Sequence, residues 1–346
     1  MSRYFKIRSK NGLFSYIIEK KAVKVIFALL VLTFLSLIVG TSFGTSKISF
    51  LDVIKVLLGQ GSANQKLVVN VLRLPRVLAA LFSGMALAAA GAILQGIIRN
   101  PLASPDIIGI TGGASFAAVF FIAFLSGSLS IQWLPLAAII GAGLVAILIY
   151  ILAWDKGVTP TRLVLIGIGI SSAMGALTTF MIIISPIHLA SQAYIWLTGS
   201  VYGTKWSMIY SVLPWIITFY VLALIFSRVV NIQEMGDQIA AGVGAPVQLH
   251  RFLLLFISVG LAGSAVALAG GIGFIGLIAP HIARKLVDRS FNEILIVSTL
   301  CGGIMVIVAD LIARTAFTPL DVPAGVFTSG IGAPFFIYLL YKKSQM

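Results

Sequence analysis

Three arginines and one aspartate stand at the ends of long apolar stretches, where an unpaired charge is costly. Asp310 and Arg314 are one helical turn apart near the end of such a stretch, so they can form an ion pair that makes both charges tolerable. Arg73 and Arg76 bracket a Leu-Pro pair at the start of another stretch. These arginines either extend along apolar surface to lipid headgroups or are held ready for a partner. The residues by themselves leave both interpretations open.

The longest polar stretch in the second half of the chain, residues 231–251, is a second candidate functional element. Asp237 is suited to cap the start of a helix, and Gly242 with Gly244 should divide the stretch into two short helices before Pro246. A short helical elbow of this kind can receive force from a soluble motor, but it can also be an ordinary surface loop. The pattern alone does not decide between the two.

Several kinds of chemistry are disfavoured by the sequence. The single cysteine, Cys301, permits neither an internal disulfide nor a cysteine metal cluster, and the three histidines are scattered without an acidic cluster beside them. Residues 271–276 match the spacing GxGxxG, but they lie among apolar spans rather than in a βαβ unit, so their glycines should serve close packing or a bend. The chain contains no GxxxxGK[ST] segment and therefore has no obvious means of hydrolysing ATP.

Composition indicates the elements that must position these residues. The chain is 59% hydrophobic and 10% charged, with a mean hydropathy of +1.08, whereas a soluble protein carries about a quarter charged residues. Ten stretches are predicted to be membrane helices, although the eighth is short and basic at its end. They cover residues 25–40, 75–98, 106–126, 133–154, 163–185, 206–229, 252–269, 272–287, 295–316 and 324–341. Residues 185–203 are amphipathic and too short to span, and we expect an interfacial or re-entrant helix there.

Charge predicts the orientation of these ten helices. Residues 1–24 carry seven basic residues and one acid, which we interpret as a cytoplasmic segment before an uncleaved first helix rather than as a signal peptide. An even number of helices places both termini on one side, and with that side cytoplasmic 17 Lys and Arg lie inside and 7 outside. The net charge of +14 is thus spread between apolar spans and does not predict a nucleic-acid partner. We expect a multi-pass protein of the cytoplasmic membrane, in contact with lipid, with its transmembrane domain over residues 25–346.

Six segments, taken together and in order, carry a resemblance to a known family. They are RLPR at 73–76, NPLASPDIIGITGGA at 100–114, GDQIAAGVGAPVQLHR at 236–251, GFIGLIAPHIAR at 273–284, ADLIART at 309–315 and VPAGVFTSGIGAPFF at 322–336. This order is similar to that of the FecCD family, the membrane permeases of ABC importers for iron-siderophore, haem and cobalamin. Two departures are Asp321, where Glu is more usual, and the sequence of the turn at 288–296.

The resemblance implies an all-α permease fold with ten membrane helices per subunit. It further implies a second permease subunit, two ATP-binding subunits that hold ATP and Mg²⁺, and an extracytoplasmic substrate-binding protein, with no cofactor in this chain. Arg73, Arg76 and Arg314 match the positions at which family members present arginines to acidic residues on the two lobes of the binding protein. Residues 236–251 match the coupling helices that enter a groove of the ATPase. The residues of this segment expected at the ATPase are Asp237, Ala240, Ala241, Gly242, Val243 and Gly244.

The predicted function is transport without chemistry on the substrate, so the chain is not expected to be an enzyme. We expect it to pass iron(III)-siderophore through the cytoplasmic membrane of a bacterium with energy from the partner ATPase. Haem or cobalamin is the alternative cargo within the same architecture. A cation-coupled secondary transporter is a more distant alternative, which the scarcity of carboxylates inside the spans disfavours, since Asp310 is the clear candidate. A membrane receptor or scaffold without transport is the second alternative.

Overall fold

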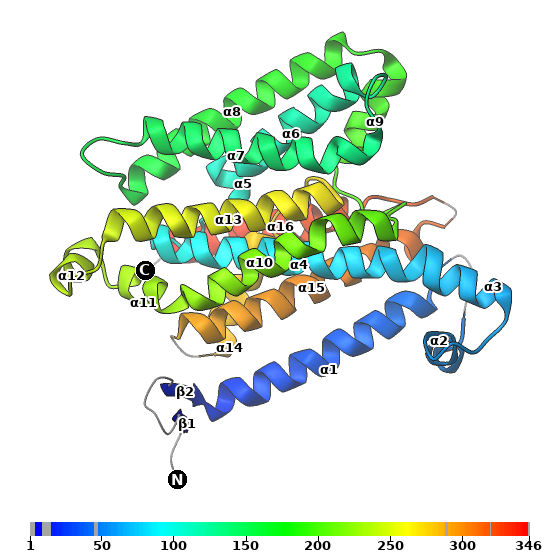
Figure 1. Cartoon of the computed structure of the whole chain (residues 1–346), viewed down its shortest axis with the longest axis horizontal. Coiled ribbons are helices and arrows are strands. Elements are labelled where there is room, and N and C mark those ends of the chain that lie inside the picture. The colour runs from blue at the N-terminus through cyan, green and yellow to red at the C-terminus, as the bar shows by residue number, and fades with distance from the viewer. Residues whose placement is uncertain (1–3, 9–14, 45–47, 288–289, 319, 345–346) are drawn as a thin grey trace.

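The protein is a bundle of helices whose long members run roughly along the longest axis of the molecule (Figure 1). The computed structural model describes residues 4–8, 15–44, 48–287, 290–318 and 320–344. Strands β1 (Tyr4–Arg8) and β2 (Ser15–Glu19) pair in antiparallel fashion ahead of the first helix, and the elements that follow are helical. Residues 1–3 and 9–14 of the predicted N-terminal segment, and residues 288 and 289 of the turn at 288–296, lie outside the described residues. The all-α fold class predicted from the sequence is confirmed.

The helices divide into long ones and short connecting ones. The long helices are α1 (Lys20–Ser42), α4 (Leu74–Ile98), α7 (Leu134–Leu152), α8 (Pro160–Ile184), α10 (Trp206–Ile225), α13 (Val247–Ala269), α15 (Phe291–Ala316) and α16 (Ala324–Ser344). The shorter helices are α2 (Phe50–Leu57), α3 (Ala63–Lys66), α5 (Pro105–Ile108), α6 (Ile110–Phe120), α9 (Ile187–Leu197), α11 (Ser227–Glu234), α12 (Asp237–Gly242) and α14 (Ile275–Leu286). Two π-helical segments, η1 (Leu67–Arg73) and η2 (Phe121–Leu125), adjoin α4 and α6, and the 3-10 helix η3 (Ile131–Trp133) precedes α7.

Eight of the ten predicted spans are confirmed as helices that are long and apolar enough to cross a membrane. The predicted span 106–126 is divided at Gly109, whose φ of 89° separates α5 from α6. The predicted span 272–287 contains α14, a helix of 12 residues with Pro280 inside it. Because these two segments are shorter than the others, the count of ten spans stays a prediction. The short helix expected at 185–203 is present as α9.

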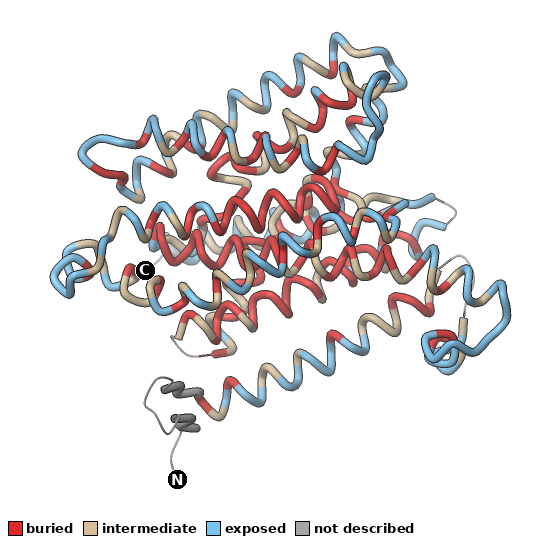
Figure 2. Tube along the Cα trace, in the orientation of Figure 1, coloured by how far each residue is buried: buried red, intermediate tan, exposed pale blue. Residues whose placement is uncertain are grey.

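The centre of the bundle is α4, which packs against α13, α14 and α15 and is buried along most of its length (Figure 2). A Cβ atom at Gly84 would lie 2.2 Å from the carbonyl oxygen of Gly302 on α15. One at Gly91 would lie 1.8 Å from that of Gly276 on α14. Both distances are far below van der Waals contact, so only glycine permits these crossings. Close backbone packing stabilises the bundle here because lipid supplies no hydrophobic drive between helices.

Three turns depend on residues with positive φ. Arg99 and Gly109, at 55° and 89°, redirect the backbone after α4 and after α5. Gly270 and Phe274, at 68° and 67°, bend the backbone between α13 and α14, in the region of the GxGxxG spacing. The prediction that the glycines of this spacing serve close packing or a bend is confirmed for close packing, since Gly276 meets α4.

The outer helices α1, α8 and α16 are apolar and mostly exposed (Figure 2). α1 lies along one edge of the bundle, and α8 lies with α6 and α7 at the opposite edge (Figure 1). So much uncovered apolar surface is unfavourable in water, so these helices must face lipid or another membrane subunit.

Candidate functional site

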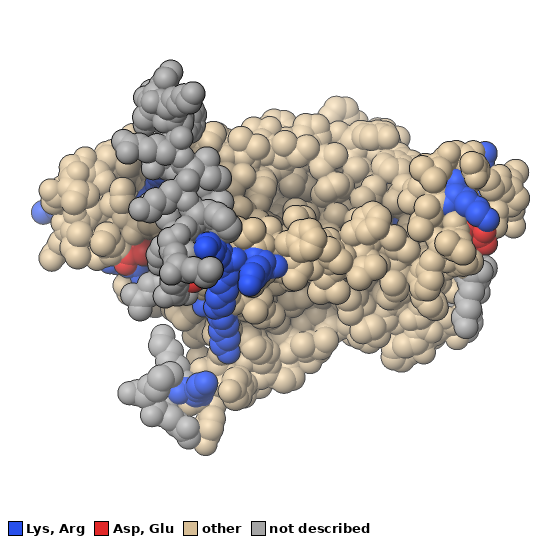
Figure 3. All heavy atoms as spheres, turned by 90° about the horizontal axis from the view of Figure 1, so that it is seen from below, with Lys and Arg blue, Asp and Glu red and all other residues tan. Residues whose placement is uncertain are grey.

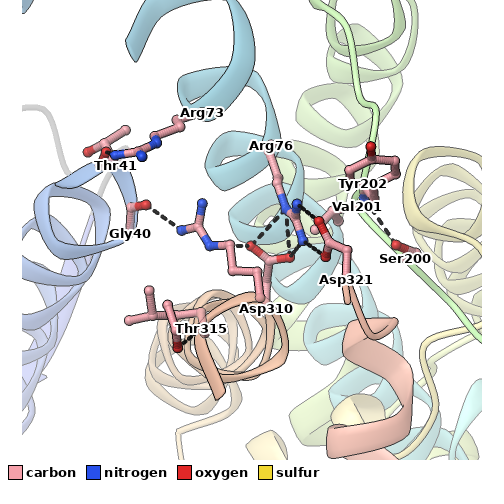
Figure 4. A network of polar contacts seen from close by, with 12 residues as sticks. Gly40, Thr41, Arg73, Arg76, Ser200, Val201, Tyr202, Asp310, Thr315 and Asp321 are labelled. Atoms are coloured by element: carbon pink, nitrogen blue, oxygen red, sulfur yellow. Dashed lines mark hydrogen bonds and ion pairs between the residues drawn. The ribbon is translucent and has the colours of Figure 1, made fainter. Parts of the chain in front are cut away.

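The three arginines predicted to act together line one hollow. Figure 4 shows Arg76 beside Asp310 and Asp321. Arg73 is the last residue of η1, Arg76 lies in the first turn of α4, and Arg314 lies in the last turn of α15. η1 runs directly into α4, since the N–H of Leu74 donates to the carbonyl oxygen of Val69, and Pro75 follows in the first turn of α4. Residues 234 positions apart meet because α4 and α15 pack side by side.

Arg76 is held by two carboxylates. Its Nε and Nη2 donate to Asp310 at 2.9 and 2.8 Å, and its Nη1 and Nη2 donate to the two oxygens of Asp321 at 2.7 Å each. The ring centre of Tyr202 lies 5.4 Å from its guanidinium carbon. A buried guanidinium is tolerated only when its charge and donors are satisfied, and these contacts satisfy both. Arg314 also pairs with Asp310 at 3.5 Å, which confirms the predicted ion pair of one helical turn.

Arg73 and Arg314 bind the last turn of α1. Arg73 donates to the carbonyl oxygens of Thr41 at 3.0 Å and Ser42 at 2.8 Å, and Arg314 donates to that of Gly40. Carbonyls in the last turn of a helix lack intrahelical partners, and a cation beside them also complements the helix dipole. The two arginines therefore join the end of α1 to α4 and α15.

These hydrogen bonds and ion pairs keep the arginine side chains inside the protein. Only 6%, 8% and 7% of the surfaces of Arg73, Arg76 and Arg314 are exposed. The interpretation in which Arg73 and Arg76 extend along apolar surface to headgroups is therefore wrong. Carboxylates and helix-end carbonyls hold both side chains inside the protein instead.

A hollow of about 800 Å³ opens over this network and is called the arginine hollow here. Its lining includes the three arginines, Lys205 and Asp321, so cations outnumber carboxylates on its surface. An excess of positive charge in a recess attracts and orients an anionic group. The arginine hollow therefore suits an acidic side chain of a partner protein, while the docking itself stays a prediction.

α12 is the short helical element expected after α11, with one difference. Between Gly236 and Pro246 there is a single helix, and Gly242 and Gly244 do not divide that part into two. Asp237 is the first residue of this helix, and Gly236, with a φ of 110°, takes the cap position. The prediction that Asp237 caps the helix is therefore wrong. Its carboxylate instead accepts two hydrogen bonds of 2.8 Å from Nη2 of Arg251.

The pair of Asp237 and Arg251 anchors α12 to the bundle. Arg251 is fully buried on α13 and also donates to the carbonyl oxygen of Val158. Arg99, directly after α4, lies 3.4 Å from Asp237, and Ala240 is buried under the helix. Asp237 thus attaches α12 to both α13 and the end of α4. A force that displaces α12 would therefore be transmitted to both helices through these ion pairs.

Three apolar side chains in and beside α12 are exposed in the described part of the chain. Ile239 lies within the helix, Met235 precedes Gly236 and Val243 directly follows Gly242, and 53%, 64% and 68% of their surfaces are exposed. The residues between and after them, Ala241, Gly242 and Gly244, are also exposed. Exposed apolar side chains gathered at an anchored helix are typical of a surface that binds another protein.

The two sites lie at opposite ends of the molecule. α12 lies at one end with the start of α1 and the end of α16, and the start of α4 lies toward the other (Figure 1). Basic side chains gather near the start of α1, where Lys21 and Lys24 are exposed (Figure 3). Among the residues that the structure describes, no group of three or more His, Cys, Asp and Glu is placed to hold a metal ion.

Two residues of these sites had no assigned role in the sequence prediction. Asp321 stood out only as a departure from a family pattern, and its contact with Arg76 joins positions 245 apart. Arg251 ends the same motif that contains Asp237, and a lone arginine at the start of an apolar span was the available signal.

The structure is therefore that of a polytopic helical membrane protein with a charged recess at one end and an anchored short helix at the other. The FecCD transport family matches residues 28–342, so the chain belongs to this family.

Individual relatives agree with this membership. The chain is 49% identical to the probable siderophore transport system permease protein YfhA of Bacillus subtilis (strain 168), over 94% of this chain and 96% of the relative. It is 46% identical to the achromobactin transport system permease protein CbrC of Dickeya dadantii (strain 3937), over 96% of each. A solved structure described as a metal-chelate type ABC transporter, in an inward-facing conformation, superposes with a TM-score of 0.83 at 29% identity. That superposition covers 92% of this chain and 99% of the solved chain.

The chain is therefore a permease subunit of an ABC-type transport system and not an enzyme. Its relatives are components of transport systems, which implies ATPase and binding-protein partners. The apolar helices and these relatives make it a multi-pass protein of a bacterial inner membrane.

Proposed function

We propose that this chain is the permease of an importer that carries iron(III)-siderophore into the bacterial cytoplasm. The names of two relatives, one a siderophore and one an achromobactin transport permease, support this cargo. A relative with 43% identity is the iron(3+)-hydroxamate import system permease protein FhuG of Bacillus subtilis (strain 168). Haem or cobalamin is the alternative cargo in the same architecture.

The observation that carries the importer function is the separation of the two sites. The start of α4, whose Arg76 lines the arginine hollow, lies toward one end of the bundle and α12 lies at the other (Figure 1). An importer needs one surface that receives loaded binding protein and another that receives force from an ATPase. The basic residues near the start of α1 support a cytoplasmic position for the α12 end, because positive charge favours the cytoplasmic side (Figure 3).

At the outer end, the arginine hollow accepts acidic side chains of the substrate-binding protein. The lining residues Arg73, Arg76, Arg314 and Lys205 supply the attraction, which sets the rate and orientation of docking. At the inner end, α12 enters a groove of the ATPase with the exposed face that contains Ile239, Gly242 and Val243. Asp237 and Ala240 fix the helix from below, so movement of the ATPase reaches α13 through Arg251.

The complete transporter contains a second permease subunit, identical or homologous, and two ATP-binding subunits that hold ATP and Mg²⁺. The exposed apolar surfaces of α1, α8 and α16 supply area for contact with the second permease and with lipid.

The test is uptake of radiolabelled iron by iron-starved cells with and without this gene. The chelates supplied are hydroxamate, catecholate and carboxylate siderophores and haem, with labelled cobalamin alongside. Loss of uptake for one siderophore class is expected. Loss of haem or cobalamin uptake alone would move the cargo and keep the importer. Uptake that continued after ATP depletion and stopped with a protonophore would refute the importer in favour of a cation-coupled transporter.

A further inference from the structure

The two carboxylates that bind Arg76, Asp310 and Asp321, differ in their exposure to the arginine hollow. The Asp310 side chain is 2% exposed and lies on α15, whereas the Asp321 side chain is 30% exposed and lines the arginine hollow. The carboxylate of Asp321 accepts hydrogen bonds of 2.7 Å from both Nη1 and Nη2 of Arg76 (Figure 4). Asp321 lies in the segment between α15 and α16. The carboxylate of Asp310 is therefore buried beneath Arg76, whereas that of Asp321 is accessible from the arginine hollow.

The edge of Arg76 that Asp321 covers is the edge a partner would use. Arginine recognises a carboxylate best through two parallel N–H bonds from neighbouring nitrogens. On Arg76 the edge formed by Nη1 and Nη2 is taken by Asp321, while Nε and Nη2 also reach Asp310 underneath. An acidic side chain that enters the arginine hollow thus meets an Arg76 already bound to a carboxylate of its own chain.

We propose that Asp321 is an internal competitor that a carboxylate of the binding protein displaces from Arg76 on docking. This inference rests on the proposed docking function of the arginine hollow. Asp310 keeps Arg76 oriented throughout, because its contacts involve Nε and lie on a buried helix. The exchange replaces one ion pair by an equivalent one, so docking remains weak enough for release after each transport cycle.

The exchange also reaches α16. Asp321 lies three residues before Ala324, the first residue of α16, and the N–H of Gly325 donates to the carbonyl oxygen of Gly199 at 2.9 Å. When Asp321 is displaced from Arg76, the ion pair that joins this segment to the start of α4 is lost. Docking at the outer end is thereby communicated to α16 as well as to α4.

The experiment measures the affinity of the binding protein of the same transport system for the purified permease–ATPase complex in nanodiscs. D321N preserves the size of the side chain and removes its charge. It should tighten binding about tenfold at low salt, because the partner then meets an Arg76 without a full competitor. D52N is the matched control, since Asp52 lies on α2, does not line the arginine hollow and carries the same charge. Its affinity should equal that of the wild type.

Co-purification of the ATPase with D321N shows that the variant is folded. An affinity for D321N that equals or falls below that of the wild type would overturn the inference and leave the docking function standing. Equal tightening in D321N and D52N would also overturn it, because the effect would then be long-range charge alone. A wild-type complex that binds no binding protein at all would overturn the docking function and this inference with it.

Discussion

Replacing Ile239 and Val243 on α12 with serine should weaken the attachment of the permease to its ATPase. These two side chains are 53% and 68% exposed, so more than half of each surface remains to be covered by a partner. Full burial of one such side chain contributes about 1.5–3 kcal/mol, so covering the exposed part of both contributes about 2 kcal/mol. That loss corresponds to a roughly 30-fold rise in Kd.

The assay is titration of purified ATPase subunit against the double variant in nanodiscs, together with ATP hydrolysis stimulated by loaded binding protein. The matched control is serine at Leu57 and Leu58, at the end of α2, where 50% and 73% of the surfaces are exposed. This pair lies toward the other end of the molecule, so its replacement should leave the Kd unchanged (Figure 1). The same Kd for the α12 variant and the wild type would refute the reasoning that the apolar face of α12 contacts the ATPase.

Three further changes test the hollow, the network beneath it and the centre of the bundle. Lys205→Glu, at an exposed position of the arginine hollow, should slow association of the binding protein several-fold at low salt and less at high salt, and a salt-independent rate equal to wild type would contradict electrostatic docking. Asp310→Asn leaves two buried guanidiniums short of charge and should lower the free energy of unfolding by about 3 kcal/mol. Asp155→Asn, in an exposed ion pair, should cost less than about 1 kcal/mol, and equal losses in thermal unfolding would count against the buried network. Gly84→Ala should reduce the yield of folded permease because its Cβ would lie 2.2 Å from a carbonyl oxygen of α15. Gly143→Ala should be tolerated, since its Cβ would meet no described atom within 4 Å, and equal yields would contradict the close crossing.

Most of the fold could be predicted because the membrane imposes a length and a composition on each spanning helix. Eight predicted spans correspond to long apolar helices for that reason. The other two predicted spans, 106–126 and 272–287, are shorter helices because the backbone takes a positive φ at Gly109 and at Phe274, which mean hydropathy does not register.

The residues of the candidate site could be predicted from the sequence, but the hydrogen bonds and ion pairs among them could not. The family motifs identified Arg73, Arg76 and Arg314, and the structure places them together. Their burial was not predictable, because it depends on the carbonyls at the end of α1 and on Asp321, far away in the chain. The prediction that Asp237 caps α12 was wrong for a similar reason, because the carboxylate of Asp237 accepts hydrogen bonds from the buried Arg251, which lies on another helix.

Local patterns of the chain were enough for the class of protein, its family and the positions of its long helices, because hydropathy and motif order depend on neighbouring residues. The tertiary structure alone decided which charges pair, which arginine edges face the arginine hollow and which face of α12 is left uncovered. The position of α12 depends on its contacts with Arg251 and Arg99, whereas the charge pairs and the exposed arginine edges depend on how α4 crosses α15 and α14. That crossing is set by backbone contact at Gly84 and Gly91, where an extra methyl group has no room.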